Sequence, residues 1–216
     1  MPEPTHKASA REFRPHPPLV IGLLGGVAAG KSLVAECFAA RGLAWIDADR
    51  KAREVVEVPS ILARIAARFG SRVLGPEGRL DRQALAAEVF TDPGARKDLE
   101  AITHPAIRAA ILHDLEAARA AGTSALLDVP LLLEGGLIER CDVCVFVEAD
   151  EATRLARALG RGWSAEEFHR RERAQASLAE KKARAAYTIR NEGSRADTSR
   201  QVDEILARLA SRPRDT

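Results

Sequence analysis

The chain has 216 residues, of which 46% are hydrophobic and 30% charged, as in a globular domain that can bury a core. Its formal net charge of +2 at pH 7 is too small to indicate a nucleic-acid-binding surface. Its apolar runs are far shorter than the ~18 residues that a transmembrane helix needs, so the composition predicts neither a nucleic-acid nor a membrane partner.

The first 18 residues are polar, contain several prolines and lack the apolar centre of a secretory signal, and we interpret 1–18 as a disordered extension. Three cysteines do not make a disulfide framework, which favours a reducing cytoplasm. Cys141 and Cys144 have the spacing of a redox pair, but their apolar surroundings predict a strand. Odd spacing on a strand points the two thiols to opposite faces, which argues against a redox or metal site.

Short apolar segments alternate with helical patterns along the chain. This alternation predicts an α/β fold in which helices cover both faces of a parallel sheet. The expected strands are 19–24, 44–46, 125–128, 143–147 and 188–190.

The segment Gly25–Ser32, GGVAAGKS, is a complete G-x-x-x-x-G-K-[ST] phosphate-binding loop between the first strand and a helix predicted over 31–41. In this setting backbone N–H groups surround a phosphate at a helix N-terminus. Lys31 is expected to reach the β- and γ-phosphates, and the Ser32 hydroxyl to bind Mg²⁺. Alanine fits the loop if its φ is negative. The expected ATP contacts here are Gly26, Val27, Ala28, Ala29, Gly30, Lys31, Ser32 and Leu33.

About eighty residues separate the second and third strands, more than an ordinary crossover needs. An apolar stripe predicts a helix over 60–69 ended by Gly70, and Asp81 can cap a helix that runs to Phe90. A third helical pattern covers 94–121, where Pro105 is expected to break or kink it. These patterns predict a helical lobe over about 51–121, and a charged insertion over about 161–184 predicts a short lid. The core then comprises about 19–50, 122–160 and 185–212.

Acidic residues follow two of the predicted strands. Asp47 and Asp49 come at the end of the second strand, and ligands of open α/β sheets bind at the carboxyl ends of strands. One carboxylate can accept a proton and one can hold Mg²⁺, or one of them caps the helix that begins near Arg50. Asp128 ends the third strand, where it can contact the metal or cap the turn at Pro130.

Several segments at matching spacings resemble the dephospho-coenzyme A kinase family, from about residue 19 to about residue 202. Besides the phosphate-binding loop, they include Ile46-Asp47-Ala48-Asp49, Leu80-Asp81-Arg82, Thr103-His104-Pro105, Leu127-Asp128-Val129-Pro130-Leu131-Leu132 and Ile189-Arg190-Asn191-Glu192-Gly193. The resemblance implies a phosphate-loop kinase with a five-stranded parallel sheet, an inserted helical substrate lobe and a helical lid. It implies transfer of the ATP γ-phosphate to the 3′-hydroxyl of dephospho-CoA, with Mg²⁺, in the cytoplasm and without an obligate protein partner.

The resemblance also implies roles for individual residues. It makes Asp49 the general base, with Lys31 and Arg161 completing the catalytic set. It places the helical lobe over dephospho-CoA, with Arg53, Asp81, Arg82, His104 and Arg108 as candidate contacts. Arg157 and Arg161, four apart on an expected helix, would face the triphosphate rather than form a solvated surface. Asn191 would contact adenine, mainly through its backbone.

Two other classes of protein share part of this pattern. Another small-molecule or nucleotide kinase would keep the phosphate-binding loop and the lid but differ in the lobe that binds the acceptor. A GTPase-type switch would carry Asn-Lys-x-Asp for guanine, and this motif is absent from the sequence.

Overall fold

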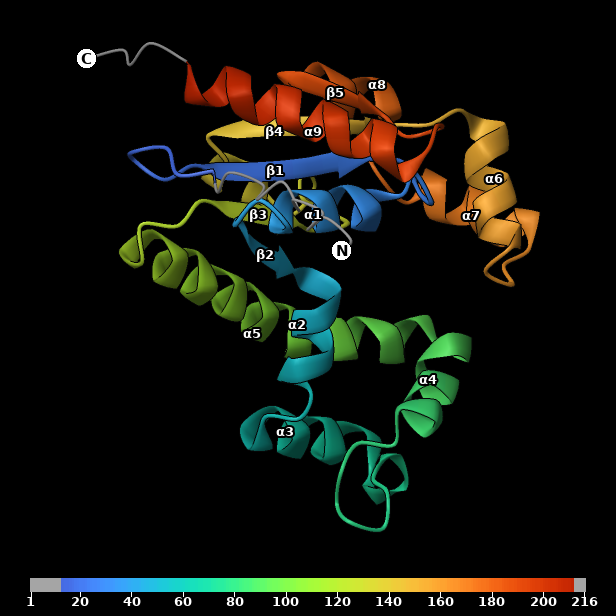
Figure 1. Ribbon diagram of the computed structural model, residues 1–216. Helices are drawn as coiled ribbons and strands as arrows, with labels where there is room; N and C mark the ends of the chain where they lie inside the picture. Colours follow the sequence, from blue (N-terminus) through green and yellow to red (C-terminus); the bar gives the residue numbers. More distant parts are fainter. Residues whose placement is uncertain (1–12, 212–216) are drawn as a thin grey trace, which may run out of the picture. The chain divides into compact units, whose positions relative to one another are not determined.

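The computed structural model describes residues 13–211, which form two compact units (Figure 1). The first unit contains the residues up to Ile46 and those from Ala117 onward. The second unit, 47–116, comprises most of the helical lobe expected over 51–121. Each unit has a hydrophobic core of its own.

Five strands form one sheet, in the spatial order β2-β3-β1-β4-β5. Parallel pairing joins β1 to β3 and β4, and β4 to β5. The six residues of β1 are all buried, as expected for a central strand covered on both faces. The predicted five-stranded parallel sheet is therefore confirmed. The strands are β1 (Val20–Gly25), β2 (Ala44–Asp47), β3 (Ala125–Asp128), β4 (Val143–Glu148) and β5 (Tyr187–Arg190).

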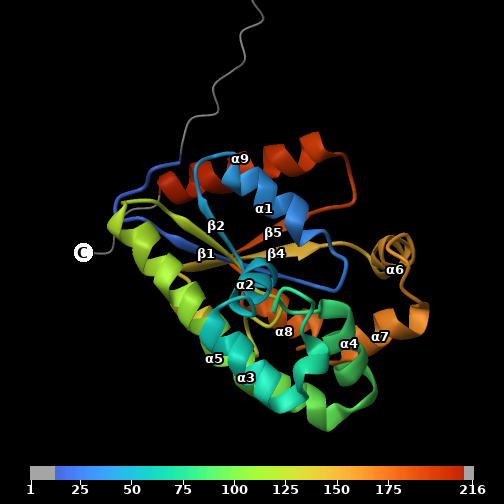
Figure 2. The same cartoon turned by 90° about the horizontal axis from the view of Figure 1, so that it is seen from below.

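Helices surround this sheet in the first unit. Figure 2 shows α1 and α9 together on one face of the sheet and α8 on the other, where α8 contacts β1. Ser177 and Ser194 begin α8 and α9 with capping boxes, which satisfy N–H groups at the helix start. The elements are α1 (Lys31–Ala39), η2 (Leu137–Arg140), α6 (Glu151–Leu159), α7 (Ala165–Arg173), α8 (Leu178–Ala183) and α9 (Arg195–Ala210).

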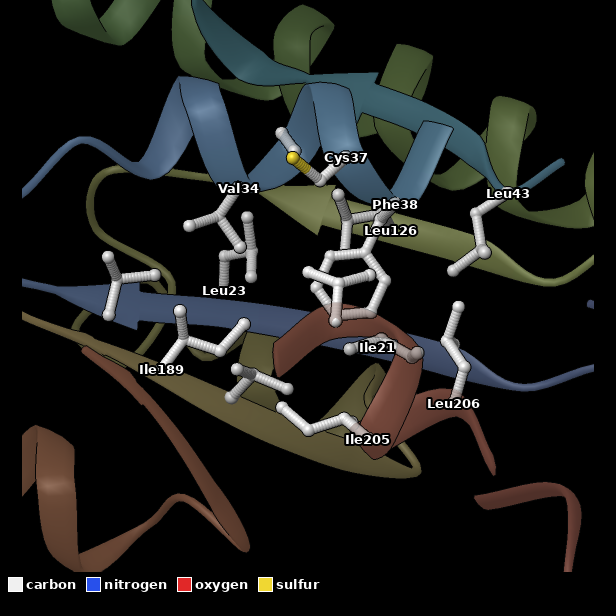
Figure 3. Close-up of a cluster of buried hydrophobic side chains, with 14 of the residues drawn as sticks. Ile21, Leu23, Val34, Cys37, Phe38, Leu43, Leu126, Ile189, Ile205 and Leu206 are labelled. Carbon is white, nitrogen blue, oxygen red and sulfur yellow. The ribbon is translucent and has the colours of Figure 1, made fainter. Parts of the chain in front are cut away.

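The core of the first unit lies between the sheet and the pair α1 and α9. Figure 3 shows Ile21 and Leu23 of β1 directed toward Val34 and Phe38 of α1. Ile205 and Leu206 of α9 extend the same cluster. This packing fixes α1 along β1, and so it fixes the two ends of the phosphate-binding loop.

The second unit is helical. Its core gathers the apolar faces of successive helices around Ile65 and Phe69, which are spaced one helical turn apart on α3. Its elements are α2 (Ala48–Val55), α3 (Pro59–Phe69), η1 (Ser71–Val73), α4 (Arg82–Thr91) and the part of α5 (Pro93–Ala120) up to Glu116.

Pro105 lies inside α5 and does not break it, because Ile102 before it and Ile107 after it both pack into the same core. The predicted break is therefore wrong, and a kink at Pro105 stays a prediction. Residues 13–18 are not a free extension, because Phe13 is buried in the first core and its N–H donates to the Arg41 carbonyl. The rest of the expected extension, 1–12, lies outside the described residues.

The expectation that the thiols of Cys141 and Cys144 point to opposite faces of a strand is also wrong. Cys141 precedes β4 rather than lying in it, so strand alternation does not apply to the pair. A Cβ on Gly22 would lie 2.7 Å from the Cys141 sulfur and 3.1 Å from the Cys144 sulfur, so both thiols meet at this glycine. Hydrogen bonding to Cys144, together with burial, raises the pKa of the Cys141 thiol. Across the described part of the chain, no helix is long and apolar enough to cross a membrane.

Candidate active site

The phosphate-binding loop connects β1 directly to α1. Ala29 N–H donates to the Gly26 carbonyl, which closes a tight turn with Ala28 at its third position. Ala28 has a φ of 57° and Gly30 a φ of 88°. The condition of a negative φ is not met at Ala28, because the third position of a type II or type I′ turn requires a positive φ. Alanine pays a modest steric penalty there that glycine would avoid.

The first turn of α1 offers backbone donors at the end of this loop. Gly30 is the N-cap of α1, and no side chain among the described residues caps the helix. Lys31 and Ser32 are its first two residues. Uncapped N–H groups and the positive end of the helix dipole both favour an anion at this position.

The side chain of Asn191, the residue just after β5, contacts and supports the phosphate-binding loop. This side chain is buried, and its Nδ2 donates to the Ala29 carbonyl over 2.8 Å. The Thr198 hydroxyl donates to its Oδ1 over 3.0 Å, which fixes the orientation of the amide. A Cβ on Gly30 would lie only 2.2 Å from Nδ2, so this position requires glycine for space as well as for φ. The sequence did not predict this use of the Asn191 side chain, and a backbone contact with adenine stays a prediction.

Two arginines of α6 hold the same loop. Arg157 donates to the Ala29 carbonyl over 3.1 Å and to the Asn191 carbonyl over 2.6 Å. Arg154 is 3% exposed and pairs with Glu172 of α7, and its Nη1 lies 3.5 Å from the Val27 carbonyl. No role was assigned to Arg154 from the sequence, although its spacing of three residues from Arg157 places both on one helical face.

Arg161 does not share that helical face. α6 ends at Leu159, and Arg161 lies exposed in the turn that follows, with its N–H donating to the Ala158 carbonyl. The expectation that Arg157 and Arg161 lie on one helix is therefore wrong, because α6 ends before Arg161 and the chain turns at Gly162, which has a φ of 82°. A role for Arg161 at the triphosphate stays a prediction.

A cavity of about 370 Å³ lies beside the loop, within the first unit. Its lining combines the start of the loop with residues of α6, the end of α7 and the α7–α8 connection. Both basic and acidic side chains line it, so an anionic ligand would meet cations already partly neutralised. The lining includes Gly26, Val27, Arg154, Glu172, Arg173 and Lys181.

In the second unit, the carboxylates of Asp47, the last residue of β2, and Asp49 differ in their contacts. Asp47 caps α2: its Oδ1 accepts from the N–H of Asp49 over 2.8 Å and from that of Arg50 over 3.1 Å. Asp49 lies exposed in the first turn of the same helix. Since the cap uses Asp47, the Asp49 carboxylate is the better candidate for a proton acceptor.

The predicted acceptor-binding residues are only partly brought together. Arg82 donates to the Arg53 carbonyl over 2.9 Å and to Glu57 over 3.0 Å. Asp81 caps α4, as its sequence position suggested, by accepting from Gln83 and Ala84 N–H groups. His104 and Arg108 are exposed and one helical turn apart on α5. A hydrogen bond thus joins Arg82 of α4 to Arg53 of α2, His104 and Arg108 share one face of α5, and contacts of these residues with dephospho-CoA stay predictions.

The metal ligands are the least defined part of the site. Asp128 is 9% exposed at the end of β3, and β3 pairs with β1. Within residues 13–211, no cluster of three or more His, Cys, Asp or Glu side chains could hold a metal. Mg²⁺ in kinases is held by one or two carboxylates together with substrate phosphates, so such a cluster is not required. Ser32, Asp47 and Asp128 stay the predicted ligands.

Comparison with known proteins identifies a family that matches this architecture. The family model described as dephospho-CoA kinase matches residues 19–197. A dephospho-CoA kinase of Anaeromyxobacter dehalogenans is 45% identical over 193 residues, which are 88% of this chain and 92% of that protein.

Two solved structures are similar along nearly their whole lengths. The crystal structure of TT1252 from Thermus thermophilus is 37% identical, with a TM-score of 0.72, and the match covers 89% of this chain and 98% of that one. A dephospho-CoA kinase from Campylobacter jejuni is 25% identical, with a TM-score of 0.67, and the match covers 88% and 96%. The chain therefore belongs to the dephospho-CoA kinase family.

Proposed function

We propose that this chain transfers the γ-phosphoryl group of ATP to the 3′-hydroxyl of dephospho-CoA, which yields coenzyme A and ADP. The single observation that carries the proposal is the complete phosphate-binding loop, Gly25–Ser32, within a chain that matches the family over 19–197. The compartment we infer is the cytoplasm, in keeping with three cysteines that are all free thiols.

The loop is proposed to bind the triphosphate. N–H groups at the start of α1 and the Lys31 ammonium would contact the β- and γ-phosphates. Arg157 and Asn191 hold the Ala29 carbonyl, so the loop is preorganised before nucleotide arrives. Preorganised donors need little reorganisation as charge develops during phosphoryl transfer.

Asp49 is proposed as the general base. Its carboxylate would accept the proton of the 3′-hydroxyl while that oxygen forms a bond to the γ-phosphorus and the bond to the ADP oxygen breaks. Support comes from its place two residues after β2 and from the use of Asp47 as the helix cap. Arg53, Arg82, His104 and Arg108 are the proposed contacts for dephospho-CoA in the helical lobe.

Mg²⁺ would neutralise charge on the β- and γ-phosphate oxygens when bound. Ser32 offers a hydroxyl and Asp128 a carboxylate, which are oxygen ligands of the kind that this ion prefers. Arg161 is proposed to add positive charge near the moving phosphoryl group.

The test is ADP release by the purified protein with Mg²⁺-ATP and dephospho-CoA, followed by mass measurement of the product. We expect turnover with a mass gain of one phosphate on the acceptor. ADP release with a nucleoside or a sugar, and none with dephospho-CoA, would instead favour another kinase of the same core. An Asp49→Asn protein serves as the background control.

A further inference from the structure

Lys181 is a buried lysine outside the residues assigned above. It lies on α8, which packs against β1, and it is 2% exposed. Its neighbour Lys182 is a useful contrast, because that side chain is 53% exposed and pairs with Glu148 over 2.5 Å. Lysine is almost never fully buried unless its charge has partners, so we expect polar or acidic groups around the Lys181 ammonium.

The ammonium of Lys181 connects two segments that are distant in sequence. Its Nζ donates to Gln175 Oε1 over 2.6 Å and lies 3.5 Å from the carbonyl of Gly25, the residue where the phosphate-binding loop begins. Glu134 Oε1 lies 3.8 Å from the same Nζ and also accepts the N–H of Ala176 over 2.6 Å. Lys181 thus ties the α7–α8 connection to the start of the loop.

Charges of both signs lie near Lys181. Burial lowers its pKa, the carboxylates of Glu134 and Glu172 raise it, and the positive charge of Lys31 lowers it further. A Cβ on Gly25 would lie 3.5 Å from Lys31 Cγ, so both lysines lie at the same glycine. Negative charge placed between them would favour the protonated form of both.

We propose that Lys181 is a positioning residue for the phosphate-binding loop: it holds the Gly25 carbonyl and the α7–α8 connection, and the phosphates of bound nucleotide complete its charge balance. The inference rests on the proposed function for the identity of its ligand, ATP. Through Lys181, the α7–α8 connection of the lid is attached to the phosphate-binding loop, and bound nucleotide strengthens this attachment. By linkage, loss of the Lys181 charge must then weaken nucleotide binding.

The decisive variant is Lys181→Met, with Lys182→Met as the matched control on the same helix. For each intact protein, steady-state kinetics give kcat and both KM values, and thermal unfolding gives Tm with and without Mg²⁺-ATP. Loss of one charge-assisted hydrogen bond predicts an ATP KM raised ~10-fold in Lys181→Met. The KM for dephospho-CoA should change less than ~2-fold, because the acceptor is not the ligand that completes the charge balance. The Tm increase on adding nucleotide should shrink in Lys181→Met and be normal in Lys182→Met.

Two results would overturn the inference. One is an unchanged ATP KM with an unchanged nucleotide-dependent Tm increase in Lys181→Met. The other is an equal weakening of ATP and dephospho-CoA binding with a large fall in the nucleotide-free Tm, which would mean general loss of structure. If Lys181→Met does not fold, Gln175→Met removes the 2.6 Å acceptor and is judged by the same criteria. Failure of the wild-type protein to phosphorylate dephospho-CoA would overturn the proposed function, while the ATP measurements on the variants would still decide the role of Lys181.

Discussion

The two compact units hold their candidate functional residues in different ways. In the first unit, contacts across long sequence distances fix the loop: Asn191 reaches the Ala29 carbonyl across 162 residues, and Lys181 reaches that of Gly25 across 156. In the second unit, Asp49, His104 and Arg108 are exposed on single helices. The proposed triphosphate site is thus held in place by contacts within the protein, whereas the candidate acceptor residues are exposed on the surface of helices. A substitution in the first unit should therefore reduce both ligand binding and the stability of the fold. A substitution in the second unit should affect either function or stability without the other.

The clearest separation of catalytic rate from stability is expected for Asp49→Asn. Loss of a general base lowers kcat by about 10²–10⁴, because the hydroxyl proton then has no acceptor of sufficient basicity. The side chain is exposed and Asp47 keeps the helix cap, so the unfolding midpoint and ATP affinity should remain those of the wild type. Single-turnover kinetics and nucleotide titration measure the two effects separately. Wild-type kcat in this variant would remove Asp49 from the mechanism.

The opposite behaviour is expected for Asn191→Ala. This change removes the hydrogen bond from Asn191 to the Ala29 carbonyl and the one that Asn191 accepts from the buried Thr198 hydroxyl, at a combined cost of about 1–3 kcal/mol in the free energy of unfolding. The loop loses its support, so ATP affinity should fall along with stability. Urea unfolding and nucleotide titration measure both. A stable protein with impaired ATP binding alone would mean that Asn191 acts directly on the ligand.

Asp81→Ala tests whether a predicted acceptor contact is structural. Asp81 caps α4, and loss of a cap costs about 1 kcal/mol in the free energy of unfolding. We expect the KM for dephospho-CoA to change less than the stability does, and Asp81→Ser to restore most of the stability because serine also caps helices. A large rise in that KM, left unrepaired by serine, would restore Asp81 as a substrate contact.

The smallest effect is expected for Ala28→Gly. Glycine relieves the strain of the positive φ at this position, and its greater freedom in the unfolded chain offsets the gain, so stability should change by less than about 1 kcal/mol. ATP affinity should also stay close to that of the wild type, because the loop uses backbone groups. Calorimetry of the two proteins, with and without nucleotide, checks both expectations. A large change in affinity would mean that the Ala28 methyl group itself contacts the ligand.

Local signals predicted the elements of this fold well. The five strands were predicted to within one residue at each end, because short apolar runs bounded by loops leave little choice of strand boundaries. The helix cap at Asp81 and the phosphate-binding loop could also be predicted from the sequence, since each depends on residues that are neighbours in sequence. The continuity of α5 through Pro105 and the burial of Phe13 were not predicted, because packing against a core overrode the local signal.

The support of the candidate site could not be read from the sequence. Asn191, Arg154 and Lys181 act on the loop through carbonyl groups, which every residue possesses and no motif records. The positive φ of Ala28 and the end of α6 before Arg161 are local backbone features, set by the turn that Gly26 closes and by the positive φ of Gly162. The contacts of Asn191, Arg154 and Lys181, in contrast, join segments far apart in sequence, so they require the structure.

The order of the strands has a consequence for synthesis of the chain. The neighbours of β1 in the sheet are β3 and β4, and both follow the whole helical unit in sequence. During translation, the helical unit can complete its local contacts while β1, an apolar strand, still has two unpaired edges. The nascent protein is therefore most vulnerable to aggregation in the interval between the emergence of β1 and that of β4, so chaperone demand should concentrate there.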